Sequence, residues 1–204
     1  MRAPDIIEFI TDPQLIGLSV SPAQETLLRA IYGLPLPSPD HLDLWRQCAG
    51  REAYPERPFG EVTVIAGARA GKDSRIAAPI ICYEALFGGH EAHLGKGEQA
   101  VIPLVAQDHR ATRIAFSHIR AYLTGSPLLA SEVEEVLSLE IHLRTRVSVY
   151  CFPCTQRSLR GWSSPAAVLD ELAFFRLEGQ ADSDAEVQAS VRRGMLTFPS
   201  PRLV

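Results

Sequence analysis

Val62-Thr-Val-Ile-Ala-Gly-Ala-Arg-Ala-Gly-Lys-Asp-Ser74 is the most informative segment of the chain. Its β-favouring residues run into a glycine-rich loop that ends in Gly71-Lys72, and helix-like sequence follows. In loops of this kind the backbone N–H groups form an anion nest, and the next helix presents the positive end of its dipole. The segment therefore predicts a strand over Val62–Ala66, a phosphate-binding loop, and a helix over Lys72–Phe87.

The loop departs from the usual phosphate-binding pattern at two positions. That pattern is Gly, four residues, Gly-Lys, and then Ser or Thr. Here Ala66 stands at the first glycine position and Asp73 at the hydroxyl position, with Ser74 one place later. A carboxylate close to phosphates repels them unless a metal ion lies between. Two alternatives stay open: Ser74 serves the metal through a shifted loop, or Asp73 coordinates it directly.

The composition is that of an ordinary globular protein, with 204 residues, 46% hydrophobic and 22% charged. This length suits one sizeable α/β domain with at most a small appendage. No apolar run reaches the roughly 18 residues of a membrane span, and Met1–Glu8 lacks the pattern of a signal peptide. We therefore expect a soluble intracellular protein without a membrane partner. The net charge of −4 gives no whole-chain nucleic-acid signature but does not exclude a local basic patch.

A Cys-x-x-Cys motif occurs once, at Cys151 and Cys154. A structural zinc site needs four ligands, and no second pair stands at a suitable spacing. Because Cys151 falls in a strand-like run, buried thiols are the favoured interpretation.

The chain divides into two regions by its pattern. Residues 1–60 predict an N-terminal helical region, with one helix over 22–32 capped by Ser21 and another over 39–47. Residues 61–204 alternate strand and helix, which implies a mostly parallel sheet with both faces covered. In this second region we expect further helices over 110–123 and 184–195, and strands over 100–106, 139–143, 147–152, 166–170 and from 202.

Two adjacent carboxylates, Asp170 and Glu171, follow the apolar run 166–169. The carboxyl edge of a parallel sheet is where ligands bind, so Asp170 would hold magnesium and Glu171 would align an attacking water. Lys72 and Asp170 are 98 residues apart (170 − 72), which leaves room for two further β–α steps. The alternative is that both acids merely end the strand and cap the next segment. Taken with the lysine loop, the pair favours a nucleotide site.

Three more residues are candidates for the same site. Gln24 offers both a donor and an acceptor, which matches the edge of adenine, although it could equally be a solvated helix residue. Arg69 lies inside the loop and Arg160 precedes the acidic strand. Either arginine could stabilise charge on a terminal phosphate, or simply be solvated.

Together these segments resemble the N-terminal ATPase domain of the large terminase subunit of tailed bacteriophages. The resemblance runs from about Phe9 to Val204. It rests on four motifs in order, namely Ser21–Gln24, Ile65–Ser74, Ser158–Gly161 and Val168–Glu171.

The resemblance implies an ASCE-type P-loop NTPase fold, in which one strand separates the acidic strand from the lysine-loop strand. It implies an ATP hydrolase that uses ATP and Mg²⁺ to drive double-stranded DNA into a capsid. By this resemblance Glu171, Lys72 and Arg69 are catalytic, and Asp170 with Ser74 or Asp73 serves the metal. The nucleotide would contact Gln24, Gly67, Ala68, Arg69, Ala70, Gly71, Lys72, Asp73 and Ser74.

The same resemblance implies the partners: double-stranded DNA, a portal protein, a small terminase subunit and a homo-oligomeric ring, in the cytoplasm of an infected bacterium. The coupling segment and the nuclease domain of the family have no counterpart here, so we expect a core incomplete at its C-terminal end and no nuclease activity. Two other functions stay open. One is a different P-loop DNA translocase of helicase type, and the other is a nucleotide-binding assembly module that does not hydrolyse.

Overall fold

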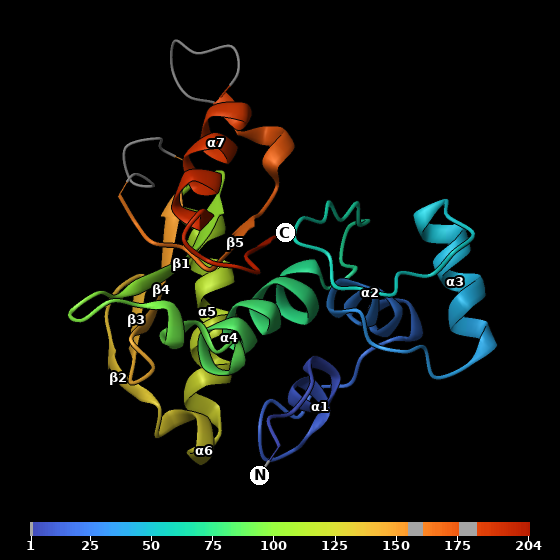
Figure 1. The fold of residues 1–204 in the computed structure, drawn as a ribbon, viewed down its shortest axis with the longest axis horizontal. Coiled ribbons are helices and arrows are strands. Elements are labelled where there is room, and N and C mark those ends of the chain that lie inside the picture. The colour runs from blue at the N-terminus through green and yellow to red at the C-terminus, as the bar shows by residue number, and fades with distance from the viewer. Residues whose placement is uncertain (1, 155–160, 176–182) are drawn as a thin grey trace.

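A computed structural model describes residues 2–154, 161–175 and 183–204. Its centre is a six-stranded sheet with the strand order β2-β3-β4-β1-β5-β6 (Figure 1). The strands are β1 Ala100–Ala106, β2 Val133–Val136, β3 Glu140–Leu143, β4 Val147–Pro153, β5 Ala166–Leu169 and β6 Arg202–Leu203.

Helices surround this sheet and also form the N-terminal part of the chain. The α-helices are α1 Ile6–Thr11, α2 Pro22–Tyr32, α3 Pro39–Ala49, α4 Ala78–Phe87, α5 His109–Gly125, α6 Pro127–Ala130 and α7 Ser183–Met195. A π-helical turn, η1 (Lys72–Ala77), leads into α4, and short 3₁₀ turns follow as η2 (His90–His93) and η4 (Leu172–Phe174). No helix in the described part of the chain is long and apolar enough to cross a membrane.

The sheet is parallel where the site is expected. Strand β1 pairs in parallel with β4 on one side and β5 on the other, and β5 pairs in parallel with β6. Only the β2-β3-β4 end is antiparallel. The expected mixed α/β architecture is therefore confirmed, and the strands predicted over 139–143 and 147–152 pair as an antiparallel hairpin.

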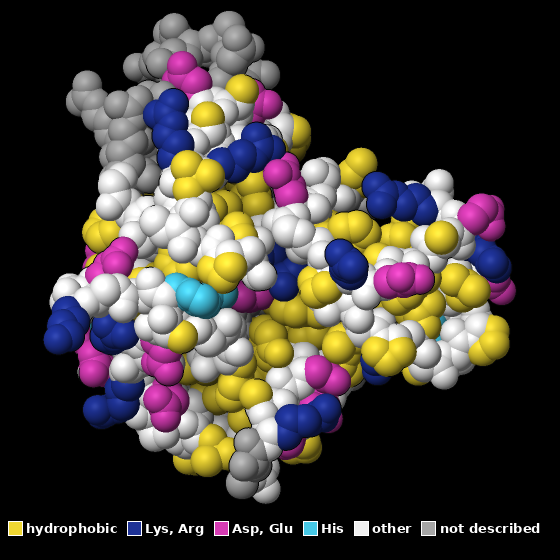
Figure 2. Space-filling view, in the orientation of Figure 1, with side chains coloured by type: hydrophobic (Ala, Val, Ile, Leu, Met, Phe, Trp, Pro, Cys, Tyr) yellow, Lys and Arg dark blue, Asp and Glu magenta, His cyan; other side chains and the backbone are white. Residues whose placement is uncertain are grey.

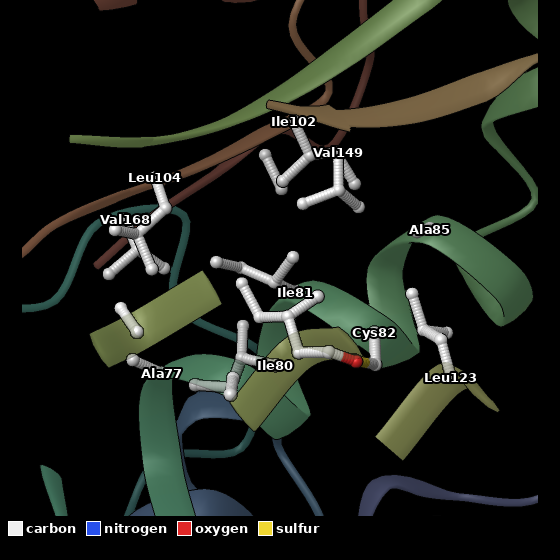
Figure 3. Close-up of a cluster of buried hydrophobic side chains, with 14 of the residues drawn as sticks. Ala77, Ile80, Ile81, Cys82, Ala85, Ile102, Leu104, Leu123, Val149 and Val168 are labelled. Carbon is white, nitrogen blue, oxygen red and sulfur yellow. The ribbon is translucent and has the colours of Figure 1, made fainter. Parts of the chain in front are cut away.

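Alternation along β1 builds a core on each face of the sheet. Ile102 and Leu104 meet α4 and α5 on one face, and Figure 3 shows Ile81 of α4 between that helix and the strands that carry Ile102 and Val149. Val105 faces the opposite side and joins a smaller cluster with α7. Both faces are thus covered by helices, as the repeating strand–helix pattern predicts.

The N-terminal helices begin and end as their sequence indicates. Ser21 caps α2, Gly33 ends it in the left-handed conformation at φ 64°, and Gly50 ends α3 in the same way at φ 61°. Helix α1 was not predicted from the sequence; Asp5 and Glu8 form a capping box at its start. Buried side chains of α1 and α2 share one core with α4, and the boundary at residue 60 remains a proposal.

The predicted strand over Val62–Ala66 is wrong in extent. Only its start is paired: Glu61 forms a parallel bridge with Leu203, and the Val62 N–H donates to the Leu203 carbonyl at 2.9 Å. Ile65 is 97% exposed, so the segment lacks the burial that makes a run of β-branched residues pair. The bridge still places β6 between β5 and the segment before the lysine loop, as the ASCE order requires.

The helix predicted over Lys72–Phe87 is confirmed, with an irregular first turn. Pro79 has no N–H and cannot join the regular ladder of hydrogen bonds. The preceding turn is wound in π-fashion, and the Ala78 N–H donates to the Asp73 carbonyl five residues earlier. Such turns are frequent at functional sites.

The cysteine interpretation holds for the Cys-x-x-Cys motif. Cys151 and Cys154 are buried free thiols, while Cys48 is exposed. Burial raises the pKa of Cys151 to about 12, so this thiol stays protonated near neutral pH.

Candidate functional site

The ammonium of Lys72 lies next to carboxylates from two distant parts of the chain. Its Nζ atom lies 2.6 Å from Asp170 Oδ1 and 2.7 Å from Asp73 Oδ1. Glu171 Oε1 is 3.5 Å from the same atom. The loop and the acidic strand end predicted separately from the sequence therefore meet at one point.

Three carboxylates around one ammonium leave an excess of negative charge. Burial alone would lower the pKa of Lys72, but hydrogen bonds to Asp170 and Asp73 outweigh it, and the pKa rises above its usual value. The pKa of Asp170 is also raised, first by burial and then by the negative charges of Asp73 and Glu171, which Lys72 only partly offsets. The carboxylates thus raise the pKa of Lys72, whereas burial is the main cause of the raised pKa of Asp170.

The sheet fixes where the acid pair stands. The Asp170 N–H donates to the Val105 carbonyl at 2.8 Å, which holds the end of β5 against β1. Glu171 then adopts the left-handed conformation at φ 57°. A non-glycine residue in this conformation costs free energy, and such residues cluster at active sites and ligand clamps. This backbone bend turns the Glu171 side chain back toward Lys72.

Asp73 and Asp170 suit a magnesium ion by their chemistry. Both are oxygen ligands directed at the same point, and Mg²⁺ in nucleotide sites needs only one or two protein carboxylates besides phosphate oxygens and water. Within residues 2–154, 161–175 and 183–204, no group of three or more His, Cys, Asp or Glu is arranged to hold a metal by itself. The carboxylates fit a metal shared with phosphates rather than a site built only of protein.

Gln24 ties helix α2 to the loop. Its Oε1 accepts from the Ser21 N–H at 3.0 Å and completes a capping box, while its Nε2 donates to the Ala70 carbonyl at 2.8 Å. Each amide atom keeps one further hydrogen-bonding position, so an interaction with adenine remains a prediction. Gly71 lies against this amide at φ 79°, and a Cβ there would meet Gln24 Nε2 at 3.1 Å.

A cavity of about 510 Å³ lies on the Gln24 side of the loop. Arg69, in the left-handed conformation at φ 59°, and the intermediate-exposed Ser74 line it. Arg75, which the sequence analysis did not select, also lines it and donates to the Ser19 carbonyl. Its position one helical turn after Gly71 was the available signal. The lining is Ser19, Val20, Ser21, Gln24, Arg69, Ala70, Gly71, Ser74 and Arg75.

The remaining predicted residues of the loop, Gly67 and Ala68, are exposed. The Gly67 carbonyl accepts from the Ala70 N–H at 3.2 Å and closes a turn. The Tyr122 hydroxyl of α5 donates to the Ser74 carbonyl at 2.8 Å and anchors the turn after the loop. Arg160 lies outside the described residues.

A second cavity, of about 530 Å³, lies between the segment Pro13–Ile16 and the ends of α5 and α6. Of the described residues that line it, Tyr122 alone has a titratable side chain. It offers no charged group for chemistry, so the Lys72 cluster and its neighbouring cavity remain the candidate site.

Replacing Gln24 tests its structural role. We expect Gln24→Ala to lower the free energy of unfolding by about 1 kcal/mol, because α2 loses half of its capping box. Gln24→Glu is the matched control, since it keeps the acceptor for Ser21 and loses only the donor to Ala70. Amide hydrogen exchange around Ala70 should then be faster in both variants. The urea concentration at the midpoint of unfolding should fall clearly only in Gln24→Ala. Equal unfolding curves for all three proteins would contradict this role.

The strand order, the lysine loop and the acidic strand end define a P-loop NTPase fold of the α/β class. The structure is similar to the crystal structure of the HK97 bacteriophage large terminase, with a TM-score of 0.63 at 16% identity. That match covers 98% of this chain and 36% of the HK97 chain, so this chain spans about a third of that protein's length. At this identity the likeness shows the fold.

The Thermus phage P74-26 large terminase ATPase domain also matches, with a TM-score of 0.44 at 16% identity over 63% of this chain and 54% of that one. No protein-family model matches this chain, and a search of curated proteins finds no match. The similarity to the HK97 large terminase confirms, at the level of the fold, the resemblance to a large terminase subunit predicted from the sequence.

Proposed function

We propose that this protein binds and hydrolyses ATP as the ATPase domain of a viral DNA-packaging terminase. The observation that carries the proposal is the meeting of Lys72 with Asp170 and Glu171 at the carboxyl edge of the parallel sheet. The fold shared with the HK97 large terminase supports it.

In this proposal the loop and its lysine bind the nucleotide. Lys72 exchanges its bonds to Asp73 and Asp170 for the terminal phosphates, and backbone N–H groups of Gly67–Ser74 cradle the others. Gln24 contacts adenine from the neighbouring cavity. Mg²⁺, when bound, neutralises charge on the phosphates, and Asp170 with Asp73 or Ser74 would hold it. The surplus of negative charge around Lys72 favours a cation at this position.

Hydrolysis then depends on two further residues. Glu171 accepts a hydrogen bond from the attacking water and aligns it with the terminal phosphate. Arg69 stabilises negative charge in the transition state from inside the loop. The partners are double-stranded DNA, a portal protein and a small terminase subunit, with a ring of copies, in the cytoplasm of the host bacterium.

The direct test measures phosphate release by the purified protein with ATP and Mg²⁺. We expect Lys72→Ala to reduce both ATP affinity and turnover, with the rate at least about 100-fold lower, because a full positive charge is lost from the phosphate site. Lys96→Ala is the control, since Lys96 is the other lysine of the chain and is exposed. Equal turnover in the wild type and in the Lys72 variant would refute the proposal.

A second candidate is a module that binds nucleotide without turnover. Asp73 favours it, because this carboxylate occupies the position of a metal-binding hydroxyl and holds Lys72 at 2.7 Å. ATP binding in the wild type without measurable phosphate release would support this module over the motor.

A further inference from the structure

Helix α5 carries only one sign of charge. Its sequence contains Arg110, Arg113 and Arg120, together with His109 and His118, and no Asp or Glu. The whole chain has a net charge of −4. Positive charge is therefore concentrated on α5 although the net charge of the protein is negative, as in proteins that use a local basic patch.

The three arginines share the solvent face of this helix. The opposite face is buried against the sheet and α4 through residues such as Phe116, Ile119 and Leu123. Arg110, Arg113 and Arg120 are all exposed. At 100° per residue they fall within about 80° of one another around the axis. They form one stripe about 15 Å long, at 1.5 Å per residue.

Within the part of the chain that the structure describes, no carboxylate pairs with the stripe. Among the described residues, none of the three arginines forms an ion pair within 4.0 Å. Arg2, Arg46 and Arg192 are different, since each has a carboxylate partner. On the face seen in Figure 2, Lys and Arg side chains lie beside Asp and Glu. The α5 stripe lacks such partners.

We propose that this face of α5 is a contact surface for the phosphate backbone of double-stranded DNA. Each strand of the duplex carries a phosphate for about every 3.4 Å of axis, so a 15 Å stripe can face several in a row. Guanidinium groups bind phosphate oxygens in a bidentate manner. Ser117 and Thr124 lie on the same face, and such short side chains let a backbone approach closely. The surface carries no sequence preference, because it reads phosphates rather than bases.

Helix α5 is connected to the candidate nucleotide site through strand β1 and Tyr122. Helix α5 begins directly after β1, with Asp108 as its cap. Strand β1 holds Asp170 through the Val105 carbonyl. Tyr122 of α5 also contacts the Ser74 carbonyl. DNA held on α5 would thus contact the same helix that supports both halves of the site. The inference rests on the proposed DNA-packaging function and locates its DNA contact.

The test is fluorescence anisotropy of a labelled DNA duplex with the full chain, in the absence of nucleotide. The variant Arg110→Gln/Arg113→Gln/Arg120→Gln should bind at least about tenfold more weakly at low salt. The logarithm of the affinity falls with the logarithm of the salt concentration, by about 0.9 for each phosphate contact. For three contacts, raising the salt from about 50 to about 200 mM should therefore weaken binding by the wild type roughly 40-fold more than binding by the variant. The control Arg2→Gln/Arg46→Gln/Arg192→Gln has the same net charge as the α5 triple variant. We expect the control to bind the duplex as tightly as the wild type does.

Three results would overturn the proposal. They are no duplex binding by the wild type, an equal loss in the control triple variant, and competition by polyglutamate as effective as by unlabelled duplex. The last result would instead indicate an acidic protein partner. Far-ultraviolet circular dichroism checks that each variant is folded. Because ATP is absent from the assay, failure here is separate from failure of hydrolysis, which the phosphate-release assay measures.

Discussion

Glu171→Gln should lower ATP turnover by at least about 100-fold, since a residue that positions or deprotonates the reacting group contributes about 10²–10⁴. ATP affinity should stay within about threefold of the wild type, because glutamine has the same size and the proposed phosphate-binding groups, Lys72 and the loop before it, are unchanged. The structural reason is the place of the Glu171 carboxylate, 3.5 Å from the lysine ammonium at the edge where the terminal phosphate would lie. Steady-state phosphate release and nucleotide titration give the two values.

Glu134→Gln is the matched control for this experiment. Glu134 is exposed on β2, and β2 is the edge strand of the sheet farthest from β5. Its replacement removes the same charge and should leave turnover unchanged. A parallel loss of ATP binding and turnover in the Glu171 variant would contradict a role in aligning water. It would indicate that Glu171 helps to bind nucleotide.

The sequence predicted the site better than it predicted the backbone around it. Lys72 and Asp170 were paired from their order and residue types, and the sheet brings them to 2.6 Å. This worked because the carboxyl ends of parallel strands share an edge. The ion pair between Asp73 and Lys72 was not predicted; it lies in the π-helical turn Lys72–Ala77, whose irregular winding the sequence pattern did not indicate.

Propensity failed where burial and pairing decide the outcome. Val62–Ala66 has strand-forming residues, yet only Glu61 and Val62 meet a neighbour, at Leu203. Strand β2 was missed because it contains two adjacent glutamates and lies partly exposed at the sheet edge. Tertiary contacts therefore override local preference at both edges of the sheet.

The pairing of charged side chains that are far apart in the chain could not be predicted from the sequence either. Glu84 of α4 is 4% exposed and lies 2.6 Å from Arg202 Nε, which is 118 residues away. The Tyr32 hydroxyl donates to Glu84 at 2.8 Å, and His90 Nε2 lies 2.9 Å from it. This buried network joins α2, η2 and β6 to the helix that continues from Lys72. It thereby fixes the Gln24 helix relative to the loop.

The negative charge of Glu84 contributes to the stability of the folded protein. Burial would raise its pKa, but the hydrogen bond with His90 and the charge of Arg202 outweigh burial and hold the pKa below the usual value. A carboxyl group with a lowered folded-state pKa stabilises the protein fully above its unfolded pKa of about 4.3. The contribution is lost as pH falls through the lowered value. Stability in acid should therefore decline below about pH 4.3.

Glu84→Gln is expected to lower the free energy of unfolding by about 3–5 kcal/mol, the cost of leaving one partner of a buried ion pair without its counter-charge. Arg202 would keep its hydrogen bonds to the Ile31 and Phe59 carbonyls at 2.9 and 2.7 Å but would have no carboxylate. Because a domain of this size loses about 2–4 °C for each kcal/mol, the midpoint of thermal unfolding should fall on the order of 10 °C.

Asp43→Asn is the control, because it breaks an ion pair that is exposed to solvent rather than buried. Asp43 and Arg46 form this pair at 3.3 Å. It should cost at most about 1 kcal/mol. A Glu84→Gln midpoint within about 2 °C of the wild type would show that the network contributes little to stability. If the midpoint falls as expected, ATP affinity of the folded variant should also weaken, because Tyr32 and Gln24 stand on the same helix. The network would then place the adenine side of the site as well as stabilise the fold.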